Sequence, residues 1–497
     1  MALDIQETEG LRFSQDAWYY DTHGILTPAY NILLAWTSSM LGVYVYDVAQ
    51  IATAIIAIFS VVAGYLIAVE LTGSKKCSVA VALTLSLFGT LVFLTGSSWK
   101  SAIGFALLGF LLYSFLHRSD RRFLAVELVI LAALPLVHHL AMAVGYLCLG
   151  YLTIITAFLA RKSGAEAKRQ TILDITILAA FSLTALVYYQ SGSLDRLSIV
   201  LSQAGLVNLA IAFAFLCAIS SFLLSRKRHL TLTLAPTTGI IVFVLFSLDR
   251  SGALFGHGYS GPDPILVLGV AVSLLVAVSW FGLERVQMSR SLHKVVPFAL
   301  LLPVLTLFMI AAMNGLSLQS HQIFYRSFDF ADLVLALGIG FAFKRVGKYP
   351  SAEAVLAAVL ICALLITFPF GYASGTLTGV RHDTQAYEVD AVEWLYESFG
   401  EDAPLQTDER LGYIALALFN FDKEPHLPDR LDSEDPLLLT WVYMYEEEWS
   451  ETGVNNYPEE YVIVDSDKIN GILLSSDVIY VGGPSDNNVI LFSLSSI

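Results

Sequence analysis

An arginine with histidine and aspartate neighbours occupies a polar stretch late in the apolar part of the chain. The stretch NGLSLQSHQIFYRSFDFADL contains His321, Arg326, Asp329 and Asp332 in a loop that enters an apolar segment. A guanidinium group can bind a phosphate through two parallel hydrogen bonds, so Arg326 is a candidate phosphate-binding residue. Two other roles are open, an ion pair with Asp329 or a long side chain that extends from the apolar segment to water.

Two adjacent histidines, His138 and His139, lie in the sequence LPLVHHLAM. Neighbouring residues on a helix point about 100° apart, so the pair lacks the i, i+4 spacing with which one helix face chelates a metal. Capping of a helix end and hydrogen bonding to a lipid head group are the main interpretations. At another turn, Trp99 and Lys100 are typical of an aromatic anchor at a membrane surface, beside a cation that contacts a head group.

Carboxylates and a histidine precede the first apolar segment. The stretch SQDAWYYDTHG contains Asp16, Asp21 and His23, and the apolar run ILTPAYNILLAWTSSMLG follows it. This run is entered through Pro28 and closed by Gly42, which are typical start and stop residues of a helix. It predicts a helix on the membrane surface rather than a span.

The elements that would position these residues are membrane spans. Hydrophobic residues make up 56% of the chain and charged residues only 14%, with a mean hydropathy of +0.67. Such a composition is far from that of an average soluble protein. We predict twelve spans, most of them close to the ~20 residues that a bilayer core requires. They lie near residues 47–71, 77–96, 101–117, 123–137, 140–160, 171–190, 198–222, 230–248, 264–283, 295–313, 327–343 and 351–371.

Basic residues predict how the spans are oriented. Most of the 28 Lys and Arg residues fall into clusters in every second gap between spans, and the other gaps are nearly free of them. Short loops rich in Lys and Arg stay on the cytoplasmic side, so the remaining gaps face outward. The clusters are Lys75/Lys76, Arg118/Arg121/Arg122, Arg161/Lys162/Lys168/Arg169, Arg226/Lys227/Arg228, Arg285/Arg290/Lys294 and Lys344/Arg345/Lys348.

The C-terminal part of the chain is strongly acidic. After Leu377 it has 25 Asp and Glu residues against 5 Lys and Arg residues, in a chain of net charge −15. A solvated acidic segment of this kind is not typical of a nucleic-acid-binding protein. Residues 384–399 have the spacing of an amphipathic helix, and strands are predicted at 405–408, 461–465, 478–481 and 489–494. A short helix is expected at 412–418.

These observations predict an all-α polytopic membrane bundle with a small C-terminal extracytoplasmic α/β domain. The expected divisions are an outward N-terminal loop and surface helix at 1–46, a transmembrane domain at 47–377 and the acidic domain at 378–497. The protein is expected to be a multi-pass protein of the plasma membrane. Its four cysteines fall in or beside predicted spans and read as small buried side chains.

This layout resembles the GT-C type membrane glycosyltransferases, among them protein O-mannosyltransferases and the catalytic subunits of oligosaccharyltransferases. The resemblance rests on DTHGILTPAYNILLAWTSSMLG before a span and a basic turn, on the His-His-Leu turn, and on an arginine late in the membrane region. The outward tail, with Val-Glu-Trp-Leu and Thr-Asp-Glu-Arg, is similar to that of archaeal members. The similarity covers most of the chain in layout, through loose motifs.

The resemblance implies inverting transfer of a sugar from a polyprenyl-phosphate-linked donor to a protein or glycan acceptor on the outer face, with membrane lipids as further partners and no nucleic acid. It also implies a carboxylate that acts as general base or holds a divalent cation, Mg²⁺ or Mn²⁺. The candidates for this carboxylate are Asp16 and Asp21, with Asp21 as the metal ligand. Donor-phosphate binding maps to Arg326, Lys100, His139 and His138, and substrate binding to His23, His321 and Tyr30.

Two features depart from the family pattern. The polar N-terminus is predicted to lie outside with no span or signal peptide before it, so we expect a first transmembrane helix to be missing from this chain. The family's acidic motif usually lies further upstream than Asp21, and Asp4, Glu7 or Glu9 is the candidate remnant of it. No two of the seven tryptophans are adjacent, so the chain lacks the Trp-Trp-Asp motif of oligosaccharyltransferases. Transfer of a whole glycan to an Asn sequon is therefore disfavoured.

Two other functions remain open. One is a transporter or flippase of a lipid-linked or small hydrophilic substrate, although the chain shows no internal repeat and few charges inside its spans. The other is a non-catalytic cell-surface assembly protein that acts through its acidic tail.

Overall fold

The chain forms two compact units, Met1–Ala373 and Ser374–Ile497. The computed structural model describes residues 28–43, 45–89, 92, 100–159, 165–191, 264–283, 292–313, 318–371, 386–400, 405–407, 415, 437–441, 477–482 and 489–493. Each unit is considered by itself. The predicted division at residues 46 and 377 stays a prediction.

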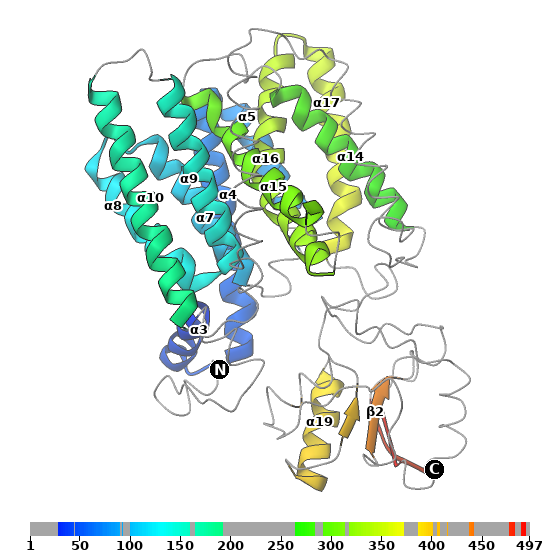
Figure 1. Ribbon diagram of the computed structural model, residues 1–497. Coiled ribbons are helices and arrows are strands. Elements are labelled where there is room, and N and C mark those ends of the chain that lie inside the picture. Colours follow the sequence, from blue (N-terminus) through cyan, green and yellow to red (C-terminus); the bar gives the residue numbers. More distant parts are fainter. Residues whose placement is uncertain are drawn as a thin grey trace. The chain divides into compact units, whose positions relative to one another are not determined.

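The described part of the first unit is helical (Figure 1). Three helices are long and apolar enough to cross a membrane, over Ile51–Thr72, His139–Ala157 and Pro350–Thr367, and four shorter apolar helices accompany them. The unit is therefore a helical membrane protein in its described part. Its helices are α3 (Pro28–Leu41), α4 (Val45–Thr72), α5 (Lys75–Leu87), α7 (Lys100–Leu116), α8 (Arg121–Val137), α9 (His139–Leu159), α10 (Ala165–Ser191), α14 (Pro264–Leu283), α15 (Leu292–Met313), α16 (Leu318–Val346) and α17 (Pro350–Thr367), with a 3₁₀ turn at Phe368–Gly371.

Two helices differ from the predicted spans. The span expected at 77–96 is interrupted, because α5 ends at Leu87 and Phe88 is extended. Hydroxyl groups of Thr84 and Ser86 each donate to the carbonyl four residues earlier, an arrangement that bends helices. In contrast, α16 is longer than expected and already begins at Leu318. The spans expected at 198–222 and 230–248 lie outside the described residues.

Basic residues from separate loops gather at one end of the helical unit. His117 lies 3.6 Å from Glu70, which joins the end of α7 to the end of α4. Lys344 donates to the carbonyl of Thr72. Three further contacts join the same end of the unit: Arg345 to the Phe281 carbonyl, Lys76 to Glu353 and Arg118 to Asp174. We call this the basic end.

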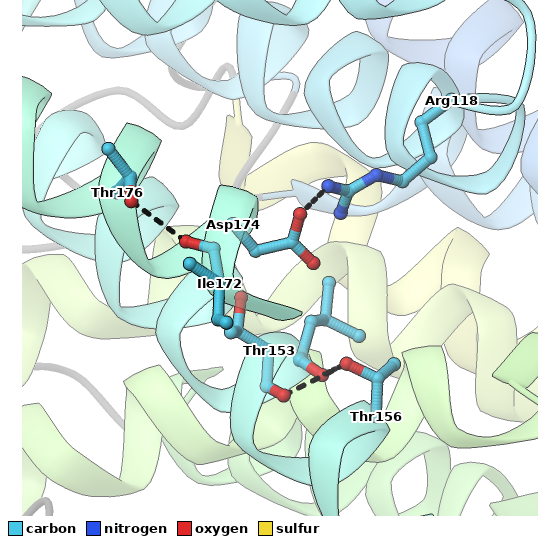
Figure 2. Close-up of polar contacts among 7 residues, drawn as sticks. Arg118, Thr153, Thr156, Ile172, Asp174 and Thr176 are labelled. Carbon is cyan, nitrogen blue, oxygen red and sulfur yellow. Dashed lines mark hydrogen bonds and ion pairs between the residues drawn. The ribbon is translucent and has the colours of Figure 1, made fainter. Parts of the chain in front are cut away.

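An ion pair buried between helices is part of the basic end. Arg118, just after α7, contacts Asp174 of α10, and their side chains are only 12% and 6% exposed (Figure 2). Arg118 also stacks on the Phe115 ring, with its guanidinium carbon 4.6 Å from the ring centroid. Glu127 of α8 is buried too and interacts electrostatically with Arg118. These three charged side chains connect α7, α8 and α10, and their interactions offset the cost of burying each charge alone.

Helices α14 and α16 approach each other so closely that no side chain fits between their backbones. A Cβ atom at Gly282 would lie 1.9 Å from the Gly338 carbonyl oxygen, and one at Gly338 would lie 2.6 Å from the Ser279 carbonyl oxygen. Small residues permit such contacts between membrane helices. Leu335 and Ile339 of α16 then pack with Ala271 and Leu275 of α14 in one apolar cluster.

The described part of the second unit contains one helix and a four-stranded sheet. The strands β1 (Leu405–Thr407), β2 (Leu437–Trp441), β3 (Asp477–Gly482) and β4 (Val489–Ser493) lie in the order β1-β2-β4-β3. Pairing is parallel between β1 and β2 and antiparallel elsewhere. The helix α19 (Ala386–Phe399) packs on β3, where the Trp394 and Tyr480 rings stack 4.9 Å apart. Burial, and then the charge of Asp390, raise the pKa of Tyr480 above its ordinary value.

The sequence predicted α19, β1, β3 and β4 within a few residues but missed β2, which is central in the sheet. Its segment LLLTW is a short continuous apolar run, and periodicity cannot distinguish such a run from a buried helix segment. The helix expected at 412–418 and the strand expected at 461–465 fall largely or wholly outside the described residues.

Substitution of Gly338 by alanine should destabilise the helical unit. The added methyl group meets backbone atoms that cannot rotate away, and overpacking of this kind costs about 2–3 kcal/mol. Gly64→Ala is the matched control, because its nearest neighbour is the flexible end of the Leu85 side chain. We expect the melting temperature in detergent to fall several degrees further for Gly338→Ala than for Gly64→Ala. Equal melting temperatures would contradict the close approach of α14 and α16.

Candidate functional site

Four described elements meet at the end of the helical unit opposite the basic end: α3, the start of α4, the start of α7 and the α8–α9 turn. Tyr30 and Leu34 of α3 pack with Val48 of α4 and with Ile103 of α7. Helix α3 also contacts α8. We call this the α3 end, and Figure 1 shows α3 there, at the bottom of the helical unit.

Helix α3 has the length and surface of a helix that lies at a membrane interface. Pro28 occupies the first helical position, and the chain leaves the helix through Gly42, which has a φ of 63°. At 14 residues the helix is about 21 Å long, too short to span a bilayer core. One face is buried in the unit, and the other exposes Trp36 by 62% and Met40 by 66%. An exposed apolar face is stable where lipid covers it.

Tyr30, predicted to bind substrate, joins α3 to α4. Its hydroxyl oxygen lies 3.0 Å from the Thr53 hydroxyl oxygen. Thr53 already donates its own proton to the Ala49 carbonyl at 2.7 Å, so Tyr30 is the donor in this contact. Burial raises the pKa of the Tyr30 phenol, which the Thr53 contact partly offsets. Tyr30 therefore remains protonated at neutral pH and holds α3 in place.

The two histidines lie at the turn between α8 and α9. His138 ends α8 in an extended conformation, and its ring Nδ1 accepts a hydrogen bond of 3.2 Å from the backbone N–H of Ala141. The ring thereby caps the start of α9, as one of the sequence interpretations held. An accepting Nδ1 carries no proton, so the proton of a neutral ring is on Nε2. The His139 ring stacks on that of His138, with centroids 5.1 Å apart.

The start of α7 lies against this turn. A Cβ atom at Gly104 would be 2.5 Å from the Ala141 Cβ and 3.4 Å from the His138 Cβ. Lys100, predicted to bind the donor phosphate, is the first residue of α7, one turn before Gly104. Ser101 is buried, and its hydroxyl has no hydrogen-bond partner among the described residues. Ser101 and Thr53 were not predicted, and their only sequence signal is a hydroxyl near the start of an apolar run.

Arg326 and His321 lie on helix α16, so the prediction that they occupy a loop is wrong. Residues 318–337 contain neither glycine nor proline, and the helix extends through them. Helices α16 and α4 run in the same direction, since Leu333 lies beside Gly64 and Lys344 beside Thr72. At 1.5 Å per residue, Arg326 is about 27 Å along α16 from Lys344, and Thr53 is about 28 Å along α4 from Thr72. The backbone of Arg326 is therefore near the level of the α3 end.

Several predicted site residues are outside what the structure describes. Asp16, Asp21 and His23 precede the first described residue, and for Lys100, His321 and Arg326 only the backbone is described. Within the described ranges, no group of three His, Cys, Asp or Glu side chains could hold a metal ion. The roles of these residues in catalysis, phosphate binding and metal binding stay predictions.

Two substitutions at His138 test its role as a helix cap. Alanine removes the acceptor of the Ala141 N–H and should destabilise the protein by about 1 kcal/mol. Asparagine retains a short side-chain acceptor and should restore most of that loss, as measured by thermal unfolding in detergent. If both variants unfold like the unsubstituted protein, the capping role is contradicted.

Comparisons with known proteins give limited information. No protein-family model matches the chain, and no curated protein matches it. Among solved structures, the chain is similar to the cryo-EM structure of the arabinofuranosyltransferase AftD from Mycobacteria, at 14% identity and a TM-score of 0.45. The similarity covers 94% of this chain and 35% of that one, so the chain spans about a third of its length. At this TM-score we infer nothing about the chain from the similarity.

Proposed function

We propose that this protein is a membrane glycosyltransferase, which transfers a sugar from a polyprenyl-phosphate-linked donor to an acceptor on the outer face. One observation carries the proposal. Elements that hold Tyr30, Lys100, His138 and His139 meet at the α3 end, and the described basic residues Lys76, Arg118, Lys344 and Arg345 gather at the other end. The GT-C resemblance in the sequence supports the same assignment.

The transfer reaction requires a cation that stabilises the departing phosphate and a carboxylate that accepts a proton. An acceptor hydroxyl bonds to the anomeric carbon of the sugar, and the bond from that carbon to the phosphate oxygen breaks. The electron pair leaves with the phosphate, so a cation beside the phosphate stabilises the transition state. The proton of the acceptor hydroxyl passes to a carboxylate. In this proposal Asp16 or Asp21 takes the proton.

Donor binding falls to the α3 end. Arg326 and Lys100 are the cations for the phosphate, with His139 beside them. In this proposal the Nε2–H of His138 donates to a phosphate oxygen, while its Nδ1 accepts from the Ala141 N–H. His23 and His321 are assigned to the sugar or the acceptor, whereas Tyr30, predicted to bind substrate, is buried against Thr53 and positions α3. The exposed apolar face of α3, with Trp36 and Met40, offers a surface for the polyprenyl chain.

Substitution of Arg326 should slow transfer strongly. Loss of a cation that stabilises the departing phosphate lowers the rate by roughly 100-fold, so we expect a drop of that size for Arg326→Ala. Arg326→Lys should fall between, since lysine supplies a point charge without the paired donors. Transfer is measured on membranes with labelled polyprenyl-phosphate sugar. Lys348→Ala, an exposed residue of the basic end, is the control and should transfer normally. Normal transfer by Arg326→Ala would refute the assignment.

Removal of divalent cations should stop the reaction if Asp21 holds a metal. We expect EDTA to abolish transfer and Mn²⁺ or Mg²⁺ to restore it, since carboxylate oxygens are the ligands that these ions prefer. Asp21→Asn should then require a higher metal concentration for half-maximal transfer. Full transfer in EDTA would remove the metal role and leave Asp21 only as a candidate base.

A further inference from the structure

A carboxylic acid lies buried inside the helical unit, and one of its oxygen atoms has no hydrogen-bond partner among the described residues. Asp332 of α16 is 3% exposed, and its Oδ2 atom makes no hydrogen bond to any described residue. It is 12 residues before Lys344, so it is about 18 Å along the helix from the basic end. Ionisable side chains at such a depth are rare and mark functional sites by default.

The position of Asp332 on its helix shows what surrounds it. Asp332 shares a helix face with Ile339 and Phe343, which follow seven and eleven residues later. Those two side chains pack in an apolar cluster that includes Cys77 and Ala80 of α5 and Leu275 of α14. The carboxyl group therefore points toward the side of α16 that α5 and α14 cover.

No described cation is placed to neutralise a charged Asp332. Helix α14 contains no ionisable residue, and the two lysines of α5 are in its first turn, at the basic end. On α16 itself, Arg326 is six residues away and on another face, whereas Asp329, one turn earlier, adds negative charge. The other helices that pack on α16 carry Asp47 and Glu70 (α4), Lys100 (α7), His293 and Lys294 (α15) and Glu353 (α17), all near helix ends.

We propose that Asp332 is a proton-binding site inside the membrane bundle and that its carboxyl group carries a proton at neutral pH. A charged carboxylate enclosed by apolar side chains and close to a second carboxylate is strongly disfavoured. Protonation removes the charge and turns the unpaired oxygen into a hydroxyl donor. Asp174 is also buried, but it can keep its negative charge because it is paired with Arg118 (Figure 2). The proposal is independent of the transferase activity.

A lipophilic carbodiimide tests the protonation state directly. It reacts with a protonated carboxyl group: the acid proton moves to a carbodiimide nitrogen, a carboxyl oxygen bonds to the central carbon, and the adduct rearranges to a stable N-acylurea. The full chain in membranes is treated with dicyclohexylcarbodiimide at pH 7, digested and analysed by mass spectrometry. We expect the adduct on Asp332 and at least tenfold less on Asp174. The adduct should vanish in Asp332→Asn and decline as the pH is raised.

A second measurement covers the case in which the reagent does not reach the site. Asparagine is the neutral analogue of protonated aspartate, so Asp332→Asn should keep the melting temperature of the unsubstituted protein at pH 7. Raising the pH to 9 should lower the melting temperature of the unsubstituted protein but not that of the variant. The proposal is overturned if Asp332→Asn is strongly destabilised at pH 7. It is also overturned if Na⁺, with choline as the control ion, protects Asp332 from the reagent, because the site then holds a cation.

Discussion

Helix ends leave backbone carbonyl groups without partners, and those that are buried away from water must be satisfied by other protein groups. The fold of the helical unit depends on how these groups are satisfied at the basic end. Lys344 donates to the Thr72 carbonyl at the end of α4, and Arg345 donates to the Phe281 carbonyl near the end of α14 while its guanidinium covers the Phe281 ring at 3.9 Å. Two neighbouring residues of α16 thereby tie down two other helices. The residues that set the predicted orientation of the chain also fasten its helices together.

The two ends of the helical unit are built from different chemistry. Charges dominate the basic end, where ion pairs such as Arg118–Asp174 and Lys76–Glu353 join separate helices. At the α3 end the described contacts use neutral groups, a Tyr30–Thr53 hydrogen bond and the His138 cap of α9.

Between the ends, helix packing relies on small residues and apolar clusters, and α16 is at the centre. It meets α14 through Gly338 and Ser279, α5 through Gly340, and α4 through Leu333. Such an apolar environment can accept a carboxyl group only if its charge is paired with a cation or removed by protonation. This constraint separates Asp174, which has Arg118, from Asp332, for which the described residues supply no cation.

The sequence by itself determined the helical class of the first unit and the approximate bounds of most of its described helices, because long apolar runs separated by basic clusters leave few alternatives. It also located α3, since Pro28 and Gly42 act through local backbone geometry. Only the tertiary structure showed that α5 ends at Leu87, that α16 begins early enough to include Arg326, and that β2 is central in its sheet. It alone assigned His138 to the start of α9 and showed Asp332 apart from described cations. The strand order and the surroundings of Asp332 depend on contacts between residues far apart in the chain, which the local patterns of hydropathy and charge do not encode.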